Sequence, residues 1–371
     1  MEFDADLIVV GGGVMGSAAA WQATRRGLSV LLLERFEAGH ALGASHGATR
    51  NFNTAYAQDD YLRLVLEART LWDELQEQSG RVLLDLVGLV NHGASGQWRR
   101  TAESLRRWGI AHRFLHPHEA AERWAGMRFR DEVLLVPDAG RVRAADALTA
   151  FRTVATAAGA QFRYGKPVRD VLTDAGTALV VTDAGEFRAP RGVVTVGAWT
   201  RELLSPRVAL PRLVVTQEQP AHFAVRPGTF EWPSFNHAPD PGAPADADWY
   251  SPVYGMLTPG EGVKAGWHGT GPVTDPDARS FQPEPAQLAA LQRYAREWLP
   301  GVDPDSCVPV SCTYTSTDDT DFVLARSGAW AVGAGFSGHG FKFAPAVGRT
   351  LVDVAHGTPA PPRFSPALPA A

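Results

Sequence analysis

A glycine-rich turn near the N-terminus constrains the fold more than any other feature of this chain. The residues Gly11-Gly12-Gly13-Val14-Met15-Gly16 follow a short apolar segment, Asp6–Val10, and precede a run of helix formers that ends near Arg26. A second apolar segment, Ser29–Leu33, ends at Glu34, 18 residues after Gly16. Short apolar segments of this kind predict buried parallel strands. Strand, helix and strand in this order predict a right-handed βαβ unit.

Each of the three glycines in the pattern G-x-G-x-x-G is needed for a physical reason. Gly11 permits a sharp turn, Gly13 lets the backbone approach a pyrophosphate, and Gly16 lets the helix pack closely on the strand. The helix N-terminus offers free N–H groups and a partial positive charge to phosphates. A carboxylate at Glu34 can accept hydrogen bonds from ribose hydroxyl groups. The turn therefore predicts a dinucleotide site without distinguishing FAD from NAD, and a glycine turn with no ligand is the alternative interpretation.

Composition restricts the partners that the chain can have. Its 371 residues are 45% hydrophobic with a net charge of −5, which predicts a folded protein of about two domains. No basic run is present, so a nucleic acid partner is not expected, because phosphate backbones are held by clustered Lys and Arg. The apolar runs are strand-sized, so no membrane span is expected. An acidic N-terminus and only two cysteines, Cys307 and Cys312, predict a cytoplasmic protein without a disulfide framework or a metal cluster.

The pattern along the remaining chain predicts how the domains are organised. Helical patterns occur at Asp60–Gln78, Ala144–Ala158, Pro285–Trp298 and from about Pro345. Strand-like segments occur at Gly88–Val90, Val133–Val136, Gln161–Tyr164, Val168–Leu172, Ala178–Thr182, Arg191–Val196 and Trp330–Val332. The stretch from Val82 to Arg143 is otherwise irregular, and the Pro/Ala-rich tail from His356 is expected to be irregular too. Apolar parallel strands thus occur early, in the middle and late, which predicts a discontinuous nucleotide-binding domain interrupted twice by a more antiparallel substrate domain.

Four widely separated motifs resemble one family. They are Ser45-His46-Gly47-Ala48-Thr49-Arg50, the helix containing Leu71-Trp72, Cys312-Thr313-Tyr314, and Gly335–Phe343, which reads GFSGHGFKF. In order and spacing, from Asp6 to about Gly357, they resemble the monomeric sarcosine oxidase and N-methyltryptophan oxidase family of FAD-dependent amine oxidoreductases, within the D-amino-acid-oxidase-like superfamily. The resemblance implies an α/β (α+β overall) fold with a Rossmann-type FAD-binding domain, expected at residues 1–83, 145–212 and 315–371. It implies a mostly antiparallel substrate domain at residues 84–144 and 213–314.

The resemblance also implies that FAD is attached covalently through a thioether to Cys312. A lone cysteine in a reduced protein is more often a small buried hydrophobe, which remains the interpretation of Cys307. Attack on the flavin requires a thiolate, which nearby positive groups would favour. The residues assigned to the cofactor by the glycine turn and the resemblance are Gly11, Gly13, Val14, Met15, Gly16, Glu34, Arg35, Ser45, His46, Thr49, Arg50, Val168, Gly197, Trp199, Cys312, Gly335, Gly338, His339, Gly340, Phe341 and Lys342.

Four charged or titratable residues match family positions around the flavin ring. Lys264 matches a lysine over the flavin that helps oxygen react, because a fixed cation stabilises developing superoxide; an exposed strand lysine is the alternative. His268 lies on the same strand face as Lys264 if the pairing is regular, and is either near the substrate amine or a core histidine. Arg50 and His46 match residues beside the ring, where a cation would stabilise the reduced flavin.

The expected substrate contacts contain one departure from the family. Lys342 matches a lysine that binds the substrate carboxylate together with an arginine, commonly three residues after the position of Arg50. This chain has Asn53 there, which has no charge for bidentate carboxylate binding. Tyr254 and Tyr314 match pocket-lining positions, with core packing as the alternative. The predicted catalytic residues are therefore Lys264, His268, Arg50, Lys342, Tyr254, Tyr314 and Asn53.

The function implied is the FAD-dependent oxidation of a secondary amine or amino acid C–N bond to an imine, with O₂ reduced to hydrogen peroxide. A small-molecule amine and O₂ are the expected partners, and a monomer is the expected state. One alternative is a dehydrogenase of the same fold that uses another electron acceptor. A second, suggested by Asn53, is an oxidase of a cyclic or natural-product amine that lacks the usual carboxylate. A third is a nucleotide-binding scaffold without chemistry.

Overall fold

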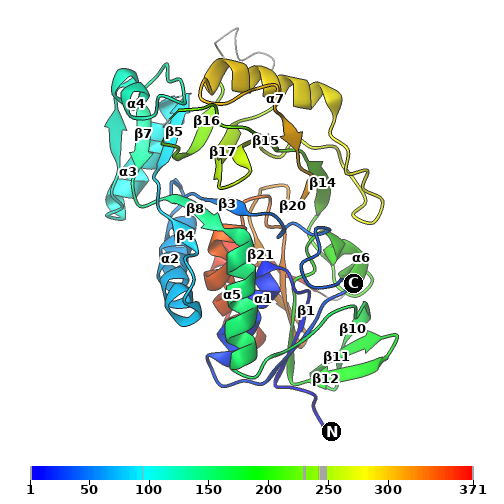
Figure 1. The fold of residues 1–371 in the computed structure, drawn as a ribbon. Helices are drawn as coiled ribbons and strands as arrows, with labels where there is room; N and C mark the ends of the chain where they lie inside the picture. Colours follow the sequence, from blue (N-terminus) through cyan, green and yellow to red (C-terminus); the bar gives the residue numbers. More distant parts are fainter. Residues whose placement is uncertain (1, 94, 229–230, 241, 243–248, 370–371) are drawn as a thin grey trace.

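The protein is built from two parts, one around a six-stranded sheet and one around an eight-stranded sheet (Figure 1). The computed structural model describes residues 2–93, 95–228, 231–240, 242 and 249–369. The predicted fold class, a parallel Rossmann-like sheet combined with a mostly antiparallel one, is confirmed. Within the described residues, no helix is both long and apolar enough to cross a membrane.

The six-stranded sheet collects strands from the beginning, middle and end of the chain. Its order is β21-β22-β13-β1-β2-β9, and every neighbouring pair is parallel except β21 with β22. The strands are β1 (Leu7–Val10), β2 (Val30–Leu33), β9 (Gln161–Arg163), β13 (Arg191–Val194), β21 (Val323–Ser327) and β22 (Trp330–Ala334). All residues of β1 and β2 are buried, as expected for a parallel sheet covered on both faces.

Four helices cover one face of this sheet and share a single apolar core. They are α1 (Val14–Thr24), α2 (Asp59–Ser79), α5 (Ala144–Ala157) and α8 (Ala344–Ala355). The other face is covered by an antiparallel sheet of β10 (Val168–Asp174), β11 (Thr177–Thr182) and β12 (Gly185–Ala189), with α6 (Thr200–Leu204) beside it. Helices α1 and α8 lie so close that a methyl group added to Gly348 would be 2.5 Å from the backbone of Ala18. The small residues on α1 therefore permit close helix packing.

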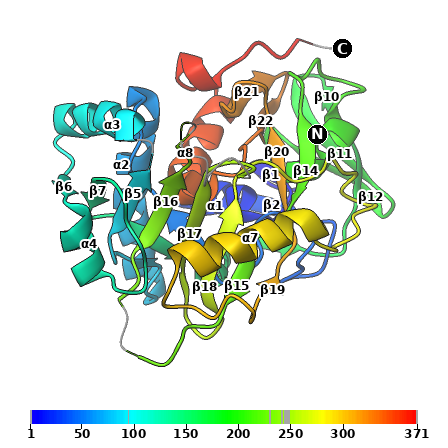
Figure 2. The same ribbon diagram turned by 90° about the horizontal axis from the view of Figure 1, so that it is seen from above.

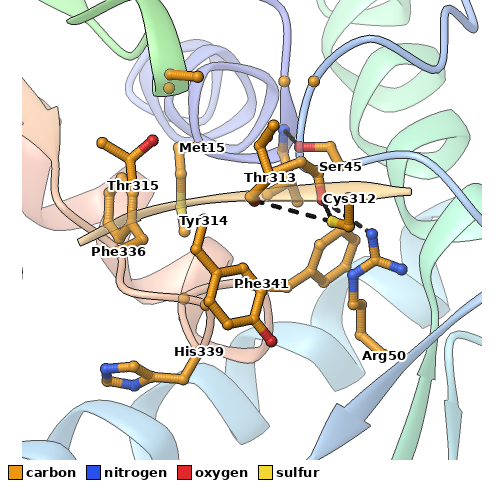
Figure 3. A pocket seen from close by; sticks show the side chains of 18 of the residues that line it. Met15, Ser45, Arg50, Cys312, Thr313, Tyr314, Thr315, Phe336, His339 and Phe341 are labelled. Carbon is orange, nitrogen blue, oxygen red and sulfur yellow. Dashed lines mark hydrogen bonds between the residues drawn. The ribbon is translucent and has the colours of Figure 1, made fainter. Parts of the chain in front are cut away.

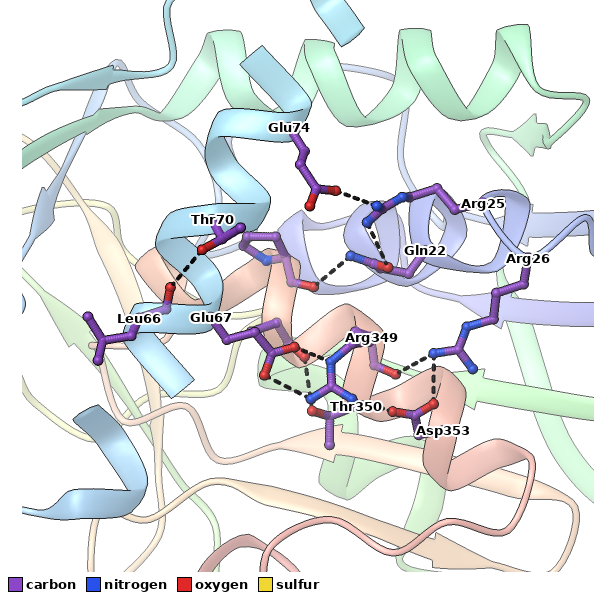
Figure 4. Close-up of polar contacts among 12 residues, drawn as sticks. Gln22, Arg25, Arg26, Leu66, Glu67, Thr70, Glu74, Arg349, Thr350 and Asp353 are labelled. Atoms are coloured by element: carbon purple, nitrogen blue, oxygen red, sulfur yellow. Dashed lines mark hydrogen bonds and ion pairs between the residues drawn. The ribbon is translucent and has the colours of Figure 1, made fainter. Parts of the chain in front are cut away.

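Ion pairs join α1, α2 and α8 to one another (Figure 4). Arg349 on α8 contacts Glu67 on α2 through both carboxylate oxygens, one of them at 2.8 Å. Arg26, just after α1, lies 2.7 Å from Asp353 on α8. Since these side chains are partly exposed, each pair contributes modestly to stability.

The eight-stranded sheet has the order β19-β15-β18-β17-β16-β5-β7-β6 and is antiparallel except where β16 meets β5. Its strands are β5 (Leu89–Gly93), β6 (Arg113–Leu115), β7 (Val133–Val136), β15 (Ala221–Phe223), β16 (Ser234–Ala238), β17 (Val253–Thr258), β18 (Gly262–Trp267) and β19 (Val308–Pro309). Helix α7 (Pro285–Trp298) lies across its outer face (Figure 2). Along β18, Val263, Ala265 and Trp267 join the core under α7, so the alternate residues face the opposite side.

Two small antiparallel sheets connect the two parts. One contains β3 (Thr49–Phe52), β8 (Gly140–Arg143) and β4 (Leu84–Asp85), and the other pairs β14 (Val214–Glu218) with β20 (Cys312–Ser316). In the first, the Asp85 carboxylate is 3.0 Å from Arg141 and 2.8 Å from Arg143. These sheets hold the ends of the two large sheets next to each other.

The sequence missed two helices between Val82 and Arg143, where it predicted irregular structure. They are α3 (Ser95–Arg107), with Trp98, Ala102 and Leu105 buried against the eight-stranded sheet, and α4 (Pro117–Arg123). The apolar spacing of α3 is helical, but its many arginines obscured it. The prediction of an irregular tail was also incomplete, since η4 (Pro362–Phe364) forms there and buries Phe364. The five predicted helices correspond to α1, α2, α5, α7 and α8, with ends shifted by at most about two residues.

Candidate active site

One cavity, of about 790 Å³, extends between the two large sheets. All of the predicted site residues line it except Gly16 and Thr49, which lie directly behind its wall. Its size is in the range of cofactor and small-molecule sites. Folding therefore brings together residues from five regions of the sequence. The sequence holds only three lysines, Lys166, Lys264 and Lys342, and all three line this cavity.

The glycine turn between β1 and α1 forms one end of the cavity. Gly11 has φ +100°, and a methyl group on Gly16 would lie 1.9 Å from the Gly11 carbonyl oxygen. Both glycines are thus required by geometry, as predicted from their spacing. The Gly12 N–H, which the sequence had not singled out, donates to Glu34 Oε2 at 2.6 Å. The Val14 N–H at the start of α1 donates to Ser45 Oγ at 3.0 Å.

A cluster of side chains lies beside the cavity next to Glu34. The Arg35 guanidinium is 3.1 Å from the Asp277 carboxylate, which also accepts a hydrogen bond from Trp199 Nε1 at 2.9 Å. Arg35 and Trp199 were predicted, as were Val168 and Gly197 (in η1, Gly197–Trp199), which also line the cavity. Asp277 was missed, because no pattern in the sequence connects its loop with residues 35 and 199.

The middle of the cavity is formed by β20 and the segment before β3. Figure 3 shows Cys312, the first residue of β20, close to the Arg50 guanidinium, with Tyr314 and Phe341 along the same wall. Arg50 donates to the carbonyl oxygens of Thr49 and Ala44, both at 2.8 Å, and to that of His46 at 2.5 Å. Burial lowers the pKa of His46, whose Nδ1 is 2.7 Å from the Gly43 carbonyl oxygen. Arg50 is therefore held rigidly as a permanent cation beside the Cys312 thiol.

The loop Gly335–Phe343, which ends in η3 (Phe341–Phe343), forms a second wall. Gly338 has φ +75°, and a methyl group on it would lie 2.0 Å from the Tyr314 ring, so only glycine permits this approach. Lys342 Nζ donates to the Tyr56 hydroxyl at 2.9 Å and to the His339 carbonyl oxygen at 2.7 Å. Burial lowers the pKa of Lys342 to about 7. Tyr56 was not predicted, although it follows Asn53 by three residues.

The inner face of the eight-stranded sheet forms the floor of the cavity. Lys264 Nζ donates to the Thr49 carbonyl oxygen at 2.6 Å, and burial together with the Arg50 charge lowers the pKa of Lys264 to about 7. His268 follows the end of β18 and lines the same cavity, with Nδ1 3.4 Å from the Tyr314 hydroxyl. Burial, reinforced by the Lys342 charge, lowers the pKa of His268 to about 4. The floor thus carries a lysine close to its titration range and a neutral imidazole.

Asparagines form the side of the cavity where the family arginine was expected. Asn53 lines the cavity, and its Oδ1 accepts a hydrogen bond from the Ala55 N–H at 2.7 Å. Asn51 Nδ2 donates to Asn236 Oδ1 at 3.3 Å, and Asn236 Nδ2 donates to Asn91 Oδ1 at 2.8 Å. This side of the cavity is polar and uncharged. Burial raises the pKa of Tyr254 and of Tyr314, so both phenols face the cavity in the neutral form.

The comparisons with known proteins agree with this geometry. The model of the DAO family, described as FAD dependent oxidoreductase, matches residues 6–354. The chain belongs to this family. This FAD-dependent oxidoreductase is an enzyme acting on CH–NH bonds. It is 31% identical to monomeric sarcosine oxidase from Bacillus sp. (strain NS-129), with 94% of this chain and 92% of the relative covered. It is 30% identical to N-methyl-L-tryptophan oxidase from Yersinia pestis (strain Pestoides F), with 96% of each chain covered.

Solved structures share the fold of this FAD-dependent oxidoreductase. NikD, described as an unusual amino acid oxidase essential for nikkomycin biosynthesis, has a TM-score of 0.85 and 31% identity, over 99% of this chain and 98% of NikD. L-proline dehydrogenase from P. horikoshii has a TM-score of 0.79 at 20% identity, which establishes a common fold alone.

The cavity fits FAD on structural grounds. Gly11, Gly12 and Gly13 line the cavity without side chains, so their backbone can approach a pyrophosphate, and the buried Glu34 carboxylate lines the cavity beside them, where it can accept from a ribose. The cavity then continues past Cys312 to the two buried lysines. In the described part of the chain, no group of three His, Cys, Asp or Glu side chains is arranged to hold a metal ion.

Proposed function

We propose that this enzyme oxidises the C–N bond of a secondary amine or amino compound to an imine and transfers the electrons to O₂, giving hydrogen peroxide. The observation that carries the proposal is Lys264, a buried lysine on the cavity floor that is held by the Thr49 carbonyl oxygen. FAD, when bound, supplies the redox chemistry, taking a hydride from the carbon beside the amine nitrogen and passing two electrons to O₂. A cation fixed at Lys264 would stabilise the negative charge that develops on oxygen.

The remaining predicted residues would orient the amine and exclude water. We assign residues 1–83, 145–212 and 315–371 to an FAD-binding domain and residues 84–144 and 213–314 to a substrate domain. Hydride loss requires the amine nitrogen lone pair, so the amine must be bound uncharged. The neutral His268 imidazole and the Tyr254 and Tyr314 hydroxyls can hydrogen-bond such an amine without charging it. Arg50 supplies a permanent cation for the reduced cofactor.

Reoxidation kinetics test the oxidase proposal. Anaerobically reduced holoenzyme is mixed with air-saturated buffer in a stopped-flow instrument, and flavin absorbance is followed. We expect fast reoxidation of the native protein and at least about tenfold slower reoxidation of Lys264→Met, because one stabilising charge is lost. Anaerobic reduction of the same variant by an amine is the internal control and should change little. Slow reoxidation of the native protein would refute the oxidase and support a dehydrogenase that uses another acceptor.

Covalent attachment of FAD to Cys312 is a separate part of the proposal, supported by the position of this thiol beside Arg50 on the cavity wall. Cys307 provides a matched control, because burial raises the pKa of its thiol to about 11, which keeps it protonated and poorly nucleophilic. Acid precipitation should leave yellow colour in the pellet of the native protein and of Cys307→Ala. It should release the colour from Cys312→Ala. A colourless native pellet would refute the attachment.

A second candidate substrate class is favoured by the asparagine side of the cavity. Asn51, Asn53 and Asn236 offer amide groups but no charge to the cavity, so cyclic or natural-product amines without a carboxylate fit this side. Peroxide release is measured with sarcosine, L-proline, L-pipecolate and piperidine. Asn53→Arg should raise turnover of the carboxylates relative to piperidine by roughly tenfold or more, the gain expected from a charged hydrogen bond. Efficient turnover of sarcosine by the native protein would refute this candidate.

A further inference from the structure

We propose that Asp277 and Arg279 retain FAD by holding one wall of the cavity in place. Both lie in the loop between β18 and α7, which Figure 1 shows in yellow, descending toward α6. Neither residue lines the cavity itself, so both act through the wall as positioning residues. The inference rests on FAD binding and not on the oxidase reaction.

The wall is the segment Arg35–Ala48, which connects β2 with β3. It contains no helix or strand, and both of its ends and much of its middle line the cavity. None of the described residues pairs its backbone with that of residues 41–47. Side chains hold this stretch instead, such as that of Arg50, which donates to the Ala44 carbonyl oxygen. A segment without backbone pairing opens more readily than a strand, so contacts on its outer side decide how firmly it stays closed.

Asp277 fastens the beginning of the wall. One carboxylate oxygen is 3.1 Å from the Arg35 guanidinium, and the other accepts a hydrogen bond from Trp199 Nε1 at 2.9 Å. The Phe36 ring packs on the Trp199 ring, with centroids 5.2 Å apart. Asp275 Oδ1 accepts from the Asp277 N–H at 2.9 Å, a turn that fixes the direction of the Asp277 side chain. One carboxylate thus ties the beginning of the wall to η1.

Arg279 fastens the middle of the wall. Its Nη2 donates to the Leu42 carbonyl oxygen at 3.1 Å, within the stretch that lacks backbone pairing. The guanidinium carbon is 4.1 Å from the centroid of the Phe281 ring, and Arg279 is only 7% exposed. Its Nε and Nη1 are buried and have no hydrogen-bond partner in the part of the chain that the structure describes. Unpaired donors on a buried cation cost stability, so this contact points to a role other than stability.

The loop that carries both residues is itself held on β14. Near its start, the Glu218 carboxylate accepts from the Gly271 N–H at 3.2 Å. Near its end, Gln217 Oε1 accepts from the Phe281 N–H at 3.1 Å. Phe281 has φ +58°, which a bulky residue rarely adopts unless its surroundings impose it. Since β14 pairs with β20, the strand of Cys312, the loop supports the wall from a base fixed beside the cavity.

These contacts should control how fast FAD leaves. FAD bound in the cavity leaves more readily when a wall opens, and each outer contact lowers the fraction of molecules in which the wall is open. Loss of one hydrogen bond or partly exposed ion pair should therefore speed release about fivefold. That factor corresponds to about 1 kcal/mol, at about 1.4 kcal/mol per factor of ten.

Flavin release from Cys312→Ala holoenzyme, which cannot hold FAD through this thiol, measures retention directly. The protein is diluted to nanomolar concentration, and the rise in FAD fluorescence follows release. Adding Asp277→Asn keeps an acceptor for Trp199 but removes the ion pair with Arg35, and should speed release about fivefold. Asp305→Asn, which breaks an exposed ion pair on α7, is the matched control and should leave the rate unchanged. Equal rates in the two variants would overturn the role of Asp277.

Two substitutions of Arg279 test its contact in the same Cys312→Ala protein. Arg279→Met keeps the length of the side chain but cannot donate to the Leu42 carbonyl oxygen, so release should be about fivefold faster. Arg279→Lys retains a charged donor and should stay within about twofold of the parent. Parental release from Arg279→Met would overturn the role of Arg279, and so would equally fast release from both variants.

Amide hydrogen exchange distinguishes an opening wall from a generally weakened protein. It is measured on holoenzyme with native Cys312, so it applies whether or not FAD is covalently attached. In Asp277→Asn and Arg279→Met, residues 36–47 should exchange about fivefold faster, while β1 and α7 keep native rates. Faster exchange in all of these regions, or in none, would overturn the proposal. Slow reoxidation of the native flavin would refute the oxidase and leave the retention of FAD as measured.

Discussion

Replacing Gly16 by alanine tests whether the turn between β1 and α1 is as restricted as its geometry indicates. A methyl group on Gly16 would lie 1.9 Å from the Gly11 carbonyl oxygen and 2.7 Å from Thr195 Oγ1. Ordinary non-bonded separations are about 3.5 Å, so the overlap with the carbonyl is about 1.5 Å. The closest atom belongs to the backbone of a turn fixed at both ends, so no side-chain rotation can relieve it.

We expect Gly16→Ala to lower the free energy of unfolding by about 3 kcal/mol, the upper part of the usual range for overpacking. Because α1 must move away from the turn, the N–H groups expected to face the pyrophosphate move too, and the flavin content should fall. Urea unfolding of the holoenzyme and the ratio of flavin to protein absorbance measure the two effects. Gly96→Ala is the control, since a methyl group there would contact nothing within 4 Å, and its stability should stay within about 1 kcal/mol of native. Native stability and full flavin content in Gly16→Ala would refute the reasoning.

Three further predictions follow from single contacts. Tyr56→Phe should lower the pKa of Lys342 below about 7, because the ammonium loses a hydrogen-bond acceptor at 2.9 Å. Titration of the lysine side chain followed by NMR measures this pKa, and an unchanged pKa would contradict the prediction. His92 has a folded-state pKa of about 3 against 6.5 unfolded, so the unfolded chain binds more protons in this window. The free energy of unfolding should therefore fall as pH drops below about 6.5, by up to about 1.4 kcal/mol per pH unit, and urea titrations should show a smaller slope for His92→Phe. Arg349→Ala should cost about 1 kcal/mol at low salt and less at high salt, whereas a salt-independent loss would argue against an ion pair.

The resemblance of the four motifs to one family identified that family and most of the residues that line the cavity. This was possible because the motifs contain positions where the fold permits only particular residue types. Gly338 must approach the Tyr314 ring, and Gly11 must adopt a positive φ, so both positions require glycine. The spacing of these glycines therefore indicates the fold even in one sequence. The same reasoning failed at α3, where arginines on the exposed face concealed a helical apolar stripe.

The sequence alone determined the βαβ unit, since strand, glycine turn and helix are neighbours in the chain and their conformations follow from local sterics and apolar spacing. Only the tertiary structure decided that His222 lies opposite Lys264, that Tyr56 accepts from Lys342, and that Asp277 links Arg35 with Trp199. Each of these contacts joins residues at least about 40 positions apart, and each depends on strand register or loop packing. A shift of one residue in the register of β15 would turn His222 into the core, and no local pattern records that register.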